Sequence, residues 1–163
     1  MAGRDGAAAA GLVLDGRGLR VAVLCSRFNA DITARLLDGA RRALARHAVG
    51  PGDVEVTWVP GVFELPLAAR AWAQTGRVDA VVCLGAVIRG ETSHYDLVAE
   101  GAARGIMRAQ LDTGVPVAFG VLTTEDVAQA EARSESEGGH NVGDEAVGTA
   151  IEMARLVASL ARP

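Results

Sequence analysis

The chain has 163 residues, half of them hydrophobic, which is enough for one domain with a substantial core and argues against general disorder. The net charge is −4 and aromatic residues make up 4%, so neither the electrostatic footprint of a nucleic-acid binder nor a base-stacking surface is present. No apolar run approaches transmembrane length, so we expect no membrane partner and a cytoplasmic location.

Short β-rich runs alternate along the chain with segments whose apolar residues recur at helical spacing. A helix that begins near residue 63 has Pro66 in its first turn, where proline is tolerated. A polar, glycine-rich stretch at 134–143 predicts a loop. In chain order, the pattern predicts a strand at 19–25, a helix over 32–44, a strand at 54–59, a helix at 63–74, a strand at 80–84, a helix from His94 or Tyr95 to about 111, a strand at 117–122, a short helix at 125–133 and a last helix at about 143–160.

Strands that are apolar throughout and alternate with helices are typical of a parallel sheet covered on both faces. The sequence therefore predicts an α/β three-layer sandwich around a four-stranded parallel sheet, of flavodoxin-like architecture. We interpret residues 1–18 as a flexible N-terminal arm and residues 19–163 as a single α/β domain. The arm resembles a short signal peptide but carries Asp5 and Asp15 and lacks a good cleavage site. It could add an edge strand to the sheet of its own or of a neighbouring subunit.

The two cysteines, Cys25 and Cys83, both fall in or at the end of apolar β-like runs. This placement predicts buried free thiols in a reducing compartment rather than a disulfide. The chain has no paired-cysteine spacing and no cluster of histidine with cysteine, so we expect no metal site.

Polar and aromatic side chains follow each predicted strand, at the edge where open α/β sheets bind small ligands. Phe28 and Asn29 follow the first strand, and Phe63 and Glu64 follow the second. The segment RGETSHYD (89–96) follows the third and contains a histidine, an arginine and two hydroxyl side chains. Such a set suggests a pocket for a flat polar ring with a hydroxylated or phosphorylated substituent.

The spacing of Gly85 and Gly90 mimics a nucleotide P-loop, but Glu91 stands where that motif needs lysine, which excludes an ATP or GTP site. The backbone amides and Thr92 could still hold a smaller phosphate. Ordinary structural roles compete for the single residues. Phe28 could belong to the core, Glu64 could be a solvated acid at a helix start, His94 a cap or surface residue, Arg133 a solvated charge, His47 a cation at a helix end and His140 a loop residue.

Taken together, these segments resemble the lumazine synthase family, and the resemblance covers nearly everything after about residue 18. The combination of VPGVFELP with VIRGETSHYD is highly specific, whereas either motif alone is only suggestive. The matching stretches come in the order and spacing of the family: SRFN (26–29), VPGVFELP (59–66), LGAVIRGETSHYDLV (84–98), FGVLTTED (119–126), HNVGDEA (140–146) and IEMA (151–154).

The resemblance implies the condensation of 5-amino-6-ribitylaminouracil with 3,4-dihydroxy-2-butanone 4-phosphate, which yields 6,7-dimethyl-8-ribityllumazine, phosphate and water. It implies these small-molecule substrates, no metal and no organic cofactor. His94 would transfer protons. The ring and ribityl chain would be held by Phe28, Asn29, Val62, Phe63, Glu64, Val87 and Ile88. The phosphate would be held by Gly90, Glu91 and Thr92, and Phe119 and the phosphate partner Arg133 would come from an adjacent subunit.

Within these roles, Phe28 would stack on the pyrimidine ring, while Asn29 and Glu64 would hydrogen-bond the ribityl chain. Val87 and Ile88 would bind the ring through main-chain groups. The resemblance also implies a homo-oligomer, since members of the family form pentamers, some of which stack further into decamers or sixty-subunit shells.

Two departures from the family pattern stand out. The usual Asn-Lys-Gly before the last helix is Asn141-Val142-Gly143 here, so an enzyme of this sequence would do without the lysine or would use His140 as a weaker substitute. The loop from Arg133 to Asn141 is one residue longer than in members that form closed capsids, which weighs against the shell. A non-catalytic flavin- or lumazine-binding protein and a shell-forming protein therefore remain as alternatives to the enzyme.

Overall fold

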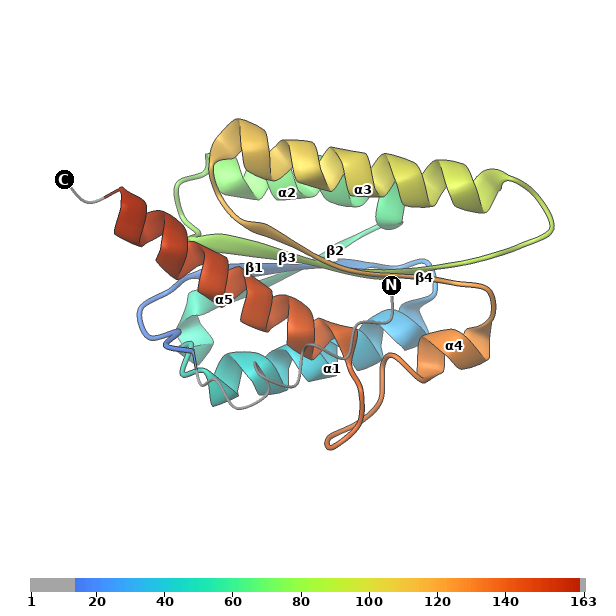
Figure 1. Ribbon diagram of the computed structural model, residues 1–163, viewed down its shortest axis with the longest axis horizontal. Helices are drawn as coiled ribbons and strands as arrows, with labels where there is room; N and C mark the ends of the chain where they lie inside the picture. Colours follow the sequence, from blue (N-terminus) through green and yellow to red (C-terminus); the bar gives the residue numbers. More distant parts are fainter. Residues whose placement is uncertain (1–13, 162–163) are drawn as a thin grey trace.

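Four parallel strands form a single sheet in the order β2-β1-β3-β4 (Figure 1). The computed structural model describes residues 14–161. This strand order is the one found in flavodoxin-like proteins, so the predicted α/β three-layer fold is confirmed. The strands are β1 (Val21–Ser26), β2 (Val54–Val59), β3 (Ala80–Ile88) and β4 (Val117–Thr124).

Helices cover both faces of the sheet (Figure 1). The helices α2 (Leu65–Gln74) and α3 (His94–Thr113) lie on one face, and α1 (Ala30–Arg46), α4 (Val127–Glu131) and α5 (Val142–Leu160) lie on the other. Short 3₁₀ turns, η2 (Pro51–Asp53) and η3 (Val62–Glu64), precede and follow β2. Helix crossovers are what parallel neighbours require, because a tight turn cannot connect them.

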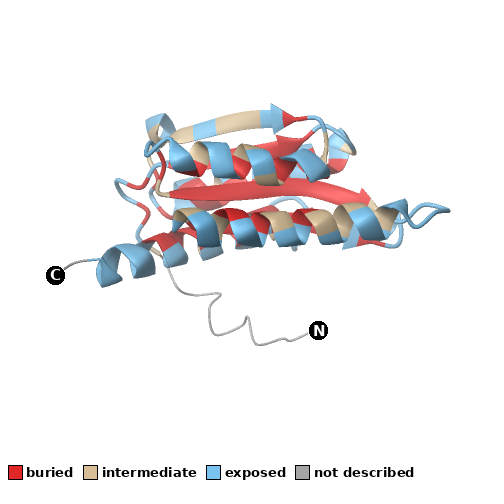
Figure 2. Ribbon diagram, turned by 90° about the horizontal axis from the view of Figure 1, so that it is seen from above, coloured by how far each residue is buried: buried red, intermediate tan, exposed pale blue. Residues whose placement is uncertain are grey.

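Alternate residues of the central strands supply two separate apolar cores, and β1 and β3 are buried over most of their length (Figure 2). In β1, Val21, Val23 and Cys25 pack on the α1–α5 side, whereas Ala22 and Leu24 pack on the α2–α3 side. Both cysteines are free and buried. Burial raises the pKa of the Cys25 thiol to about 12 and also raises the pKa of Cys83, so neither thiol is reactive near neutrality.

The third strand is longer than the sequence predicts, since it continues past Leu84 to Ile88. The added residues pair with Val121–Thr124 of β4, which therefore also extends beyond its expected end at Leu122. The glycine-rich segment that begins at Gly85 is thus largely strand. In addition, α4 starts only at Val127, because the side chain of Asp126 caps it by accepting a hydrogen bond from Gln129 N–H (2.8 Å).

The segment before β1 is described from Leu14 onward; residues 1–13 of the expected arm (1–18), and any edge strand that they form, lie outside the described residues. Leu14 N–H donates to His47 Nδ1 (3.2 Å), and Gly16 N–H donates to His47 O (2.7 Å). On the other side, Arg155 donates to Asp15 O (2.8 Å) and to Arg17 O (2.6 Å). Residues 14–18 are therefore held against α1 and α5.

These contacts overturn the expected role of His47 as a cation at the end of a helix. Its side chain is only 5% exposed and accepts a hydrogen bond through Nδ1, which requires the neutral form of the ring. Burial, followed by the neighbouring charge of Arg46, lowers the pKa of His47 below its ordinary value. His47 therefore stabilises the structure as a neutral acceptor.

Candidate active site

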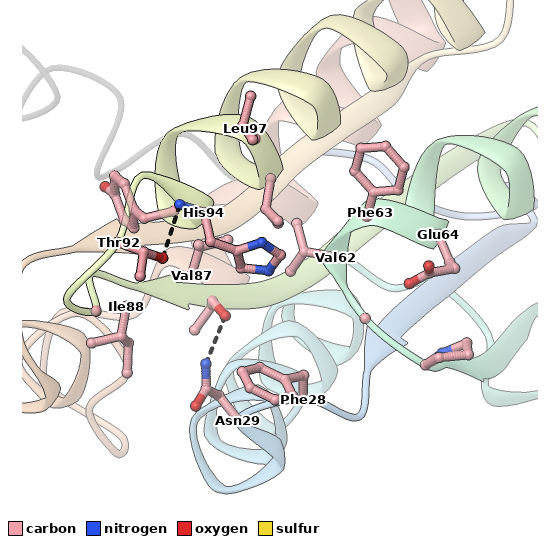
Figure 3. A pocket seen from close by; sticks show the side chains of 16 residues that line it. Phe28, Asn29, Val62, Phe63, Glu64, Val87, Ile88, Thr92, His94 and Leu97 are labelled. Atoms are coloured by element: carbon pink, nitrogen blue, oxygen red, sulfur yellow. Dashed lines mark hydrogen bonds between the residues drawn. The ribbon is translucent and has the colours of Figure 1, made fainter.

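A cavity of about 760 Å³ opens at the carboxyl ends of β1, β2 and β3, where ligands bind in open α/β sheets (Figure 3). Within the described residues, no helix is long and apolar enough to cross a membrane, and no cluster of three or more potential ligand side chains could hold a metal ion. The cavity is lined by Phe28, Asn29, Pro60, Gly61, Val62, Phe63, Glu64, Ala86, Val87, Ile88, Gly90, Thr92, His94, Tyr95, Leu97 and Val98.

The turn after β1 places Phe28 and Asn29 at the cavity. Arg27 N–H donates to Val59 O (2.8 Å) and Phe28 N–H donates to Pro60 O (3.1 Å), which continues the β1–β2 pairing beyond the strands. The ring of Phe28 is consequently held at the mouth of the cavity and is 73% exposed. An exposed aromatic face at a cavity mouth is suited to stacking on a flat ligand.

Asn29 has the left-handed backbone conformation (φ 58°), and its Nδ2 donates to Ala86 O (2.9 Å) (Figure 3). Since the carbonyl of Ala86 can only accept, this bond determines the orientation of the amide. The Oδ1 of Asn29 is therefore the atom that remains for a ligand, as an acceptor for a hydroxyl or N–H group.

The last part of β3 has a strand partner on one side only. Pairing with β1 ends at Leu84, whereas β3 continues to Ile88 beside β4. The β1 side of this extension faces the cavity, where Ala86 O already accepts from Asn29. Main-chain groups of the extension are therefore positioned to pair with a ligand in place of a strand.

Main-chain groups alternate in direction along a strand, which distinguishes the two residues expected to bind the ring through their backbone. Arg89 N–H donates to Thr124 O on the β4 side (2.9 Å), and Ala86 O points to the opposite side. By this alternation Ile88 presents its N–H and C=O to the cavity, while those of Val87 point to β4. The geometry thus favours a main-chain contact for Ile88 and a side-chain contact for Val87.

Gly85, at the start of this extension, lies in close contact with Ser26 and Val62. A Cβ at this position would lie 2.5 Å from Ser26 Oγ and 2.7 Å from a methyl group of Val62, so no larger residue fits without a shift. Gly85 therefore lies in β3 rather than in a loop. Its role is the close approach of β3 to the end of β1 and to the turn after β2.

The loop after β3 brings Gly90, Thr92 and His94 to the cavity. Thr92 Oγ1 accepts from His94 N–H (3.3 Å), and the imidazole of His94 points into the cavity near Val62, opposite Phe28 and Asn29 (Figure 3). This arrangement places a titratable ring between the aromatic wall and the loop, where it can exchange protons with a bound molecule.

The residues after β2 form the remaining wall. Phe63 packs on α3 at Gly101, where its ring leaves no room for a side chain. The carboxylate of Glu64 is exposed, and no hydrogen bond joins it to another of the described residues. It is the only carboxylate among the cavity-lining residues, which makes it an acceptor for the hydroxyl groups of a ligand.

Three of the expected site residues lie elsewhere in the single chain. Glu91 is in the loop but does not line the cavity. Phe119 lies on the edge strand β4 with 42% of its surface exposed, and Arg133 follows α4, where its Nη1 donates to Gln129 O (3.0 Å). The end of β4 is the one strand end that contributes no lining residue.

Positive charge is scarce around the cavity. None of its described lining residues is an arginine, and the whole sequence contains no lysine, since all 16 basic residues are arginines. A phosphate in the cavity could use backbone N–H groups, Thr92 and His94 of this chain, but any full guanidinium charge would have to come from outside the lining residues.

The structure also reveals lining residues that the sequence reasoning missed. Tyr95, Leu97 and Val98 follow His94 on the first turns of α3, and helical spacing from His94 could have indicated Leu97 and Val98. Nothing in the sequence pattern points to the carbonyl of Ala86, which enters the site only because β3 outruns β1.

The fold and the cavity define a class of protein: a parallel α/β protein that binds a small molecule at the carboxyl edge of its sheet. Residues 18–158 match the family model for 6,7-dimethyl-8-ribityllumazine synthase, and the chain belongs to this family. The resemblance inferred from the motifs is thereby confirmed, and the family places the chain in riboflavin biosynthesis.

Proposed function

We propose that the chain is an active 6,7-dimethyl-8-ribityllumazine synthase, a transferase that joins 5-amino-6-ribitylaminouracil to 3,4-dihydroxy-2-butanone 4-phosphate. The proposal rests on one observation: four kinds of functional group line the same cavity. One concave site combines an exposed ring (Phe28), a carboxylate (Glu64), an imidazole (His94) and the loop residues Gly90 and Thr92. The ring suits a flat ligand, the carboxylate a ribityl chain and the loop a phosphate, while the imidazole can transfer protons.

The first subsite would hold the aminouracil. Its ring would stack on Phe28 and pair with the exposed main-chain groups of Ile88, which stand where a further strand would otherwise bond. The ribityl hydroxyls would donate to Asn29 Oδ1 and to the carboxylate of Glu64, supported by main-chain groups at Val62 and Phe63. Fixing both ends of this substrate orients its amine toward the second subsite.

The second subsite would hold the butanone phosphate at Gly90, Glu91 and Thr92. The amine attacks the ketone and water leaves, which forms an imine; the phosphate then departs, and ring closure releases a second water. These steps move protons to and from nitrogen and oxygen near neutral pH, the task proposed for His94. Phosphate departure is favoured by N–H and hydroxyl donors placed around the leaving group.

We further propose that the site is completed by a neighbouring copy of the chain in a pentamer, with Phe119 and Arg133 as the contributed residues. The lack of an arginine among the cavity-lining residues supports this, because a dianionic phosphate favours a guanidinium partner. The exposed ring of Phe119 and the exposed side chain of Arg133 support it as well. The buried reduced cysteines support a cytoplasmic location for this activity.

The test is formation of the lumazine chromophore by the purified protein with both substrates. The reaction mixture without protein and the His94→Ala protein serve as controls, because the two substrates also condense spontaneously. We expect product well above both controls. A protein that binds riboflavin or the product yet forms no more lumazine than the protein-free mixture would instead be the non-catalytic binding module.

A further inference from the structure

Arg89 lies where three parts of the site meet: the end of β3, the first turn of α3 and the turn after β4. Its main-chain N–H donates to Thr124 O (2.9 Å). Its Nε donates to the carboxylate of Glu125 (2.8 Å), and its Nη1 lies 3.4 Å from Asp96 Oδ1. Its guanidinium carbon lies 4.2 Å from the centroid of the Tyr95 ring. A single side chain thus ties α3 to the β4–α4 turn.

The guanidinium of Arg89 is occupied by these partners and does not line the cavity. The hydrogen bond to Glu125 and the nearby carboxylate of Asp96 raise its pKa above the ordinary value, so it stays charged. Two carboxylates already balance that charge, and the face of Tyr95 covers it. Arg89 can therefore influence a ligand only through the groups that it holds.

The loop between Arg89 and His94 has few contacts of its own. Residues 90–93 are all exposed, and their hydrogen bonds stay within the loop and the first turn of α3: His94 N–H donates to Thr92 Oγ1, and Asp96 and Leu97 N–H donate to Ser93 O. The geometry of this loop consequently depends on its two ends. Arg89 forms the first end, and its contacts with Tyr95 and Asp96 hold the second.

We propose that Arg89 is a positioning residue that keeps the anion-holding loop and His94 at a set distance from the open edge of β3. The proposal rests on the proposed synthase function, since it concerns the subsite for the butanone phosphate. A forked, planar guanidinium can grip two carboxylates and an aromatic face at once, which a flexible point charge cannot do. Arg89 thereby acts as a clamp that holds the reacting groups in place to within a fraction of an ångström.

The test compares Arg89→Met, Arg89→Lys and Glu125→Gln with the parent. Arg89→Met should lower kcat/KM for the butanone phosphate about 10- to 100-fold, mainly through KM, and change KM for the aminouracil less than about twofold. Arg89→Lys should recover only part of the loss, because lysine keeps one ion pair and loses the fork and the stacking. Glu125→Gln should shift the same parameter in the same direction by a smaller factor.

The matched control is Arg77→Met. Arg77 also pairs with a carboxylate, Glu55 (3.8 Å), and covers an aromatic ring, Trp72 (5.1 Å to the centroid), but at a site remote from the cavity-lining residues. This variant should leave both KM values near those of the parent. Circular dichroism and thermal unfolding of every variant show whether the fold is retained.

Two readouts do not require turnover: backbone amide exchange of His94, Asp96 and Leu97, whose N–H groups donate to Thr92 and Ser93, and competition by inorganic phosphate for binding of the butanone phosphate. Folded Arg89→Met should exchange these amides faster and lose affinity for inorganic phosphate. Unchanged exchange and unchanged phosphate affinity in folded Arg89→Met would overturn the proposal, as would equal losses for both substrates. A parent that makes no lumazine would refute the proposed function, and the two turnover-free readouts would still decide the role of Arg89.

Discussion

The two sides of the sheet differ in where their helices leave large apolar side chains exposed. On the α1–α5 side, α1 has none, and those that are exposed on the other helices are confined to Val127 at the start of α4 and to the last turns of α5, from Met153 to Leu160. On the α2–α3 side, large apolar residues are exposed along both helices and around the cavity: Phe63, Leu67, Leu97, Met107 and Leu111.

Polar groups differ between the start of α5 and the cavity in how completely they are hydrogen-bonded. Asn141, before α5, is buried and makes four hydrogen bonds: Nδ2 donates to Arg35 O (3.0 Å) and Glu135 O (2.9 Å), and Oδ1 accepts from the N–H groups of Gly143 (2.9 Å) and Asp144 (3.3 Å). At the cavity, by contrast, the amide of Asn29, which precedes α1, and the carboxylate of Glu64 keep acceptor atoms unused. The start of α5 is therefore organised for stability, and the cavity at the carboxyl edge of the sheet for binding.

The largest expected effect is on activity and comes from the cavity. His94→Ala should lower turnover by about 10²- to 10⁴-fold, the usual contribution of general acid–base help, although spontaneous condensation masks part of it. The His94 side chain is exposed, so thermal unfolding should be nearly unchanged. Steady-state kinetics and a melting curve of the same preparation measure both. A folded variant with parental turnover would remove His94 from the mechanism.

A pair of asparagine substitutions compares the start of α5 with the cavity directly. Asn141→Ala leaves the buried N–H of Gly143 without its acceptor and should cost roughly 2–3 kcal/mol of unfolding free energy. Asn29→Gly should cost little stability, because glycine adopts the left-handed conformation of this residue freely, while binding of the aminouracil weakens. Urea unfolding and KM values measure the two effects. Equal stability losses in Asn141→Ala and Asn29→Gly would show that the start of α5 and the cavity do not differ in their contribution to stability.

A third set of variants separates the two subsites of the cavity. Glu64→Gln should weaken binding of the aminouracil more than that of the butanone phosphate, by roughly 1.5–3 kcal/mol, because a charged hydrogen bond to hydroxyls is lost. Thr92→Ala and Arg133→Ala should do the reverse. The KM values for each substrate, measured at saturation with the other, give the comparison. If all three variants affected both substrates equally, the assignment of subsites would not hold.

The smallest effect concerns the pH dependence of stability on the α1–α5 side. Because the pKa of His47 is lowered in the folded chain, the unfolded chain takes up its proton first, at about pH 6.5. The stability that depends on neutral His47 is fully present above that pH. This contribution to the free energy of unfolding decreases as the pH falls below 6.5, and it stops decreasing below the pKa of His47 in the folded chain.

His47→Gln keeps an acceptor for Leu14 N–H but has no proton to gain. The difference in melting temperature between the parent and this variant should therefore narrow between about pH 8 and about pH 5. A difference that stays constant or widens over this range would contradict the placement of neutral His47 in the folded chain.

The fold was largely predictable because period and composition agree along the whole chain. The apolar run at β1 and the alternating pattern at β2 predicted these strands, and the apolar stripe from Ile32 to Leu44 predicted α1. The extension of β3 was not predictable, because Gly85 to Ile88 reads equally well as a loop. Only pairing with β4, a long-range contact, decides between the two.

The sequence predicted which strand ends contribute residues to the candidate site, but not how those residues are arranged in space. Phe28, Glu64 and His94 could be named because their residue types carry chemistry at positions that converge in a parallel sheet. The direction of the main chain at Ile88 and the clamp at Arg89 depend on register and side-chain contacts, which a single sequence does not reveal. His47 was misjudged because its burial depends on the segment from Leu14 to Gly16.

If the cavity at the carboxyl edge of the sheet is an enzyme site completed by a neighbouring chain, variants impaired in its two halves should complement each other. Purified His94→Ala and Arg133→Ala proteins are denatured together and refolded as mixed assemblies, with mass spectrometry to confirm mixing. Separately refolded proteins that are pooled afterwards serve as the control. We expect partial recovery of lumazine formation, since some interfaces then pair an intact His94 with an intact Arg133. Mixed assemblies no more active than the pooled control would show that each chain carries its whole site.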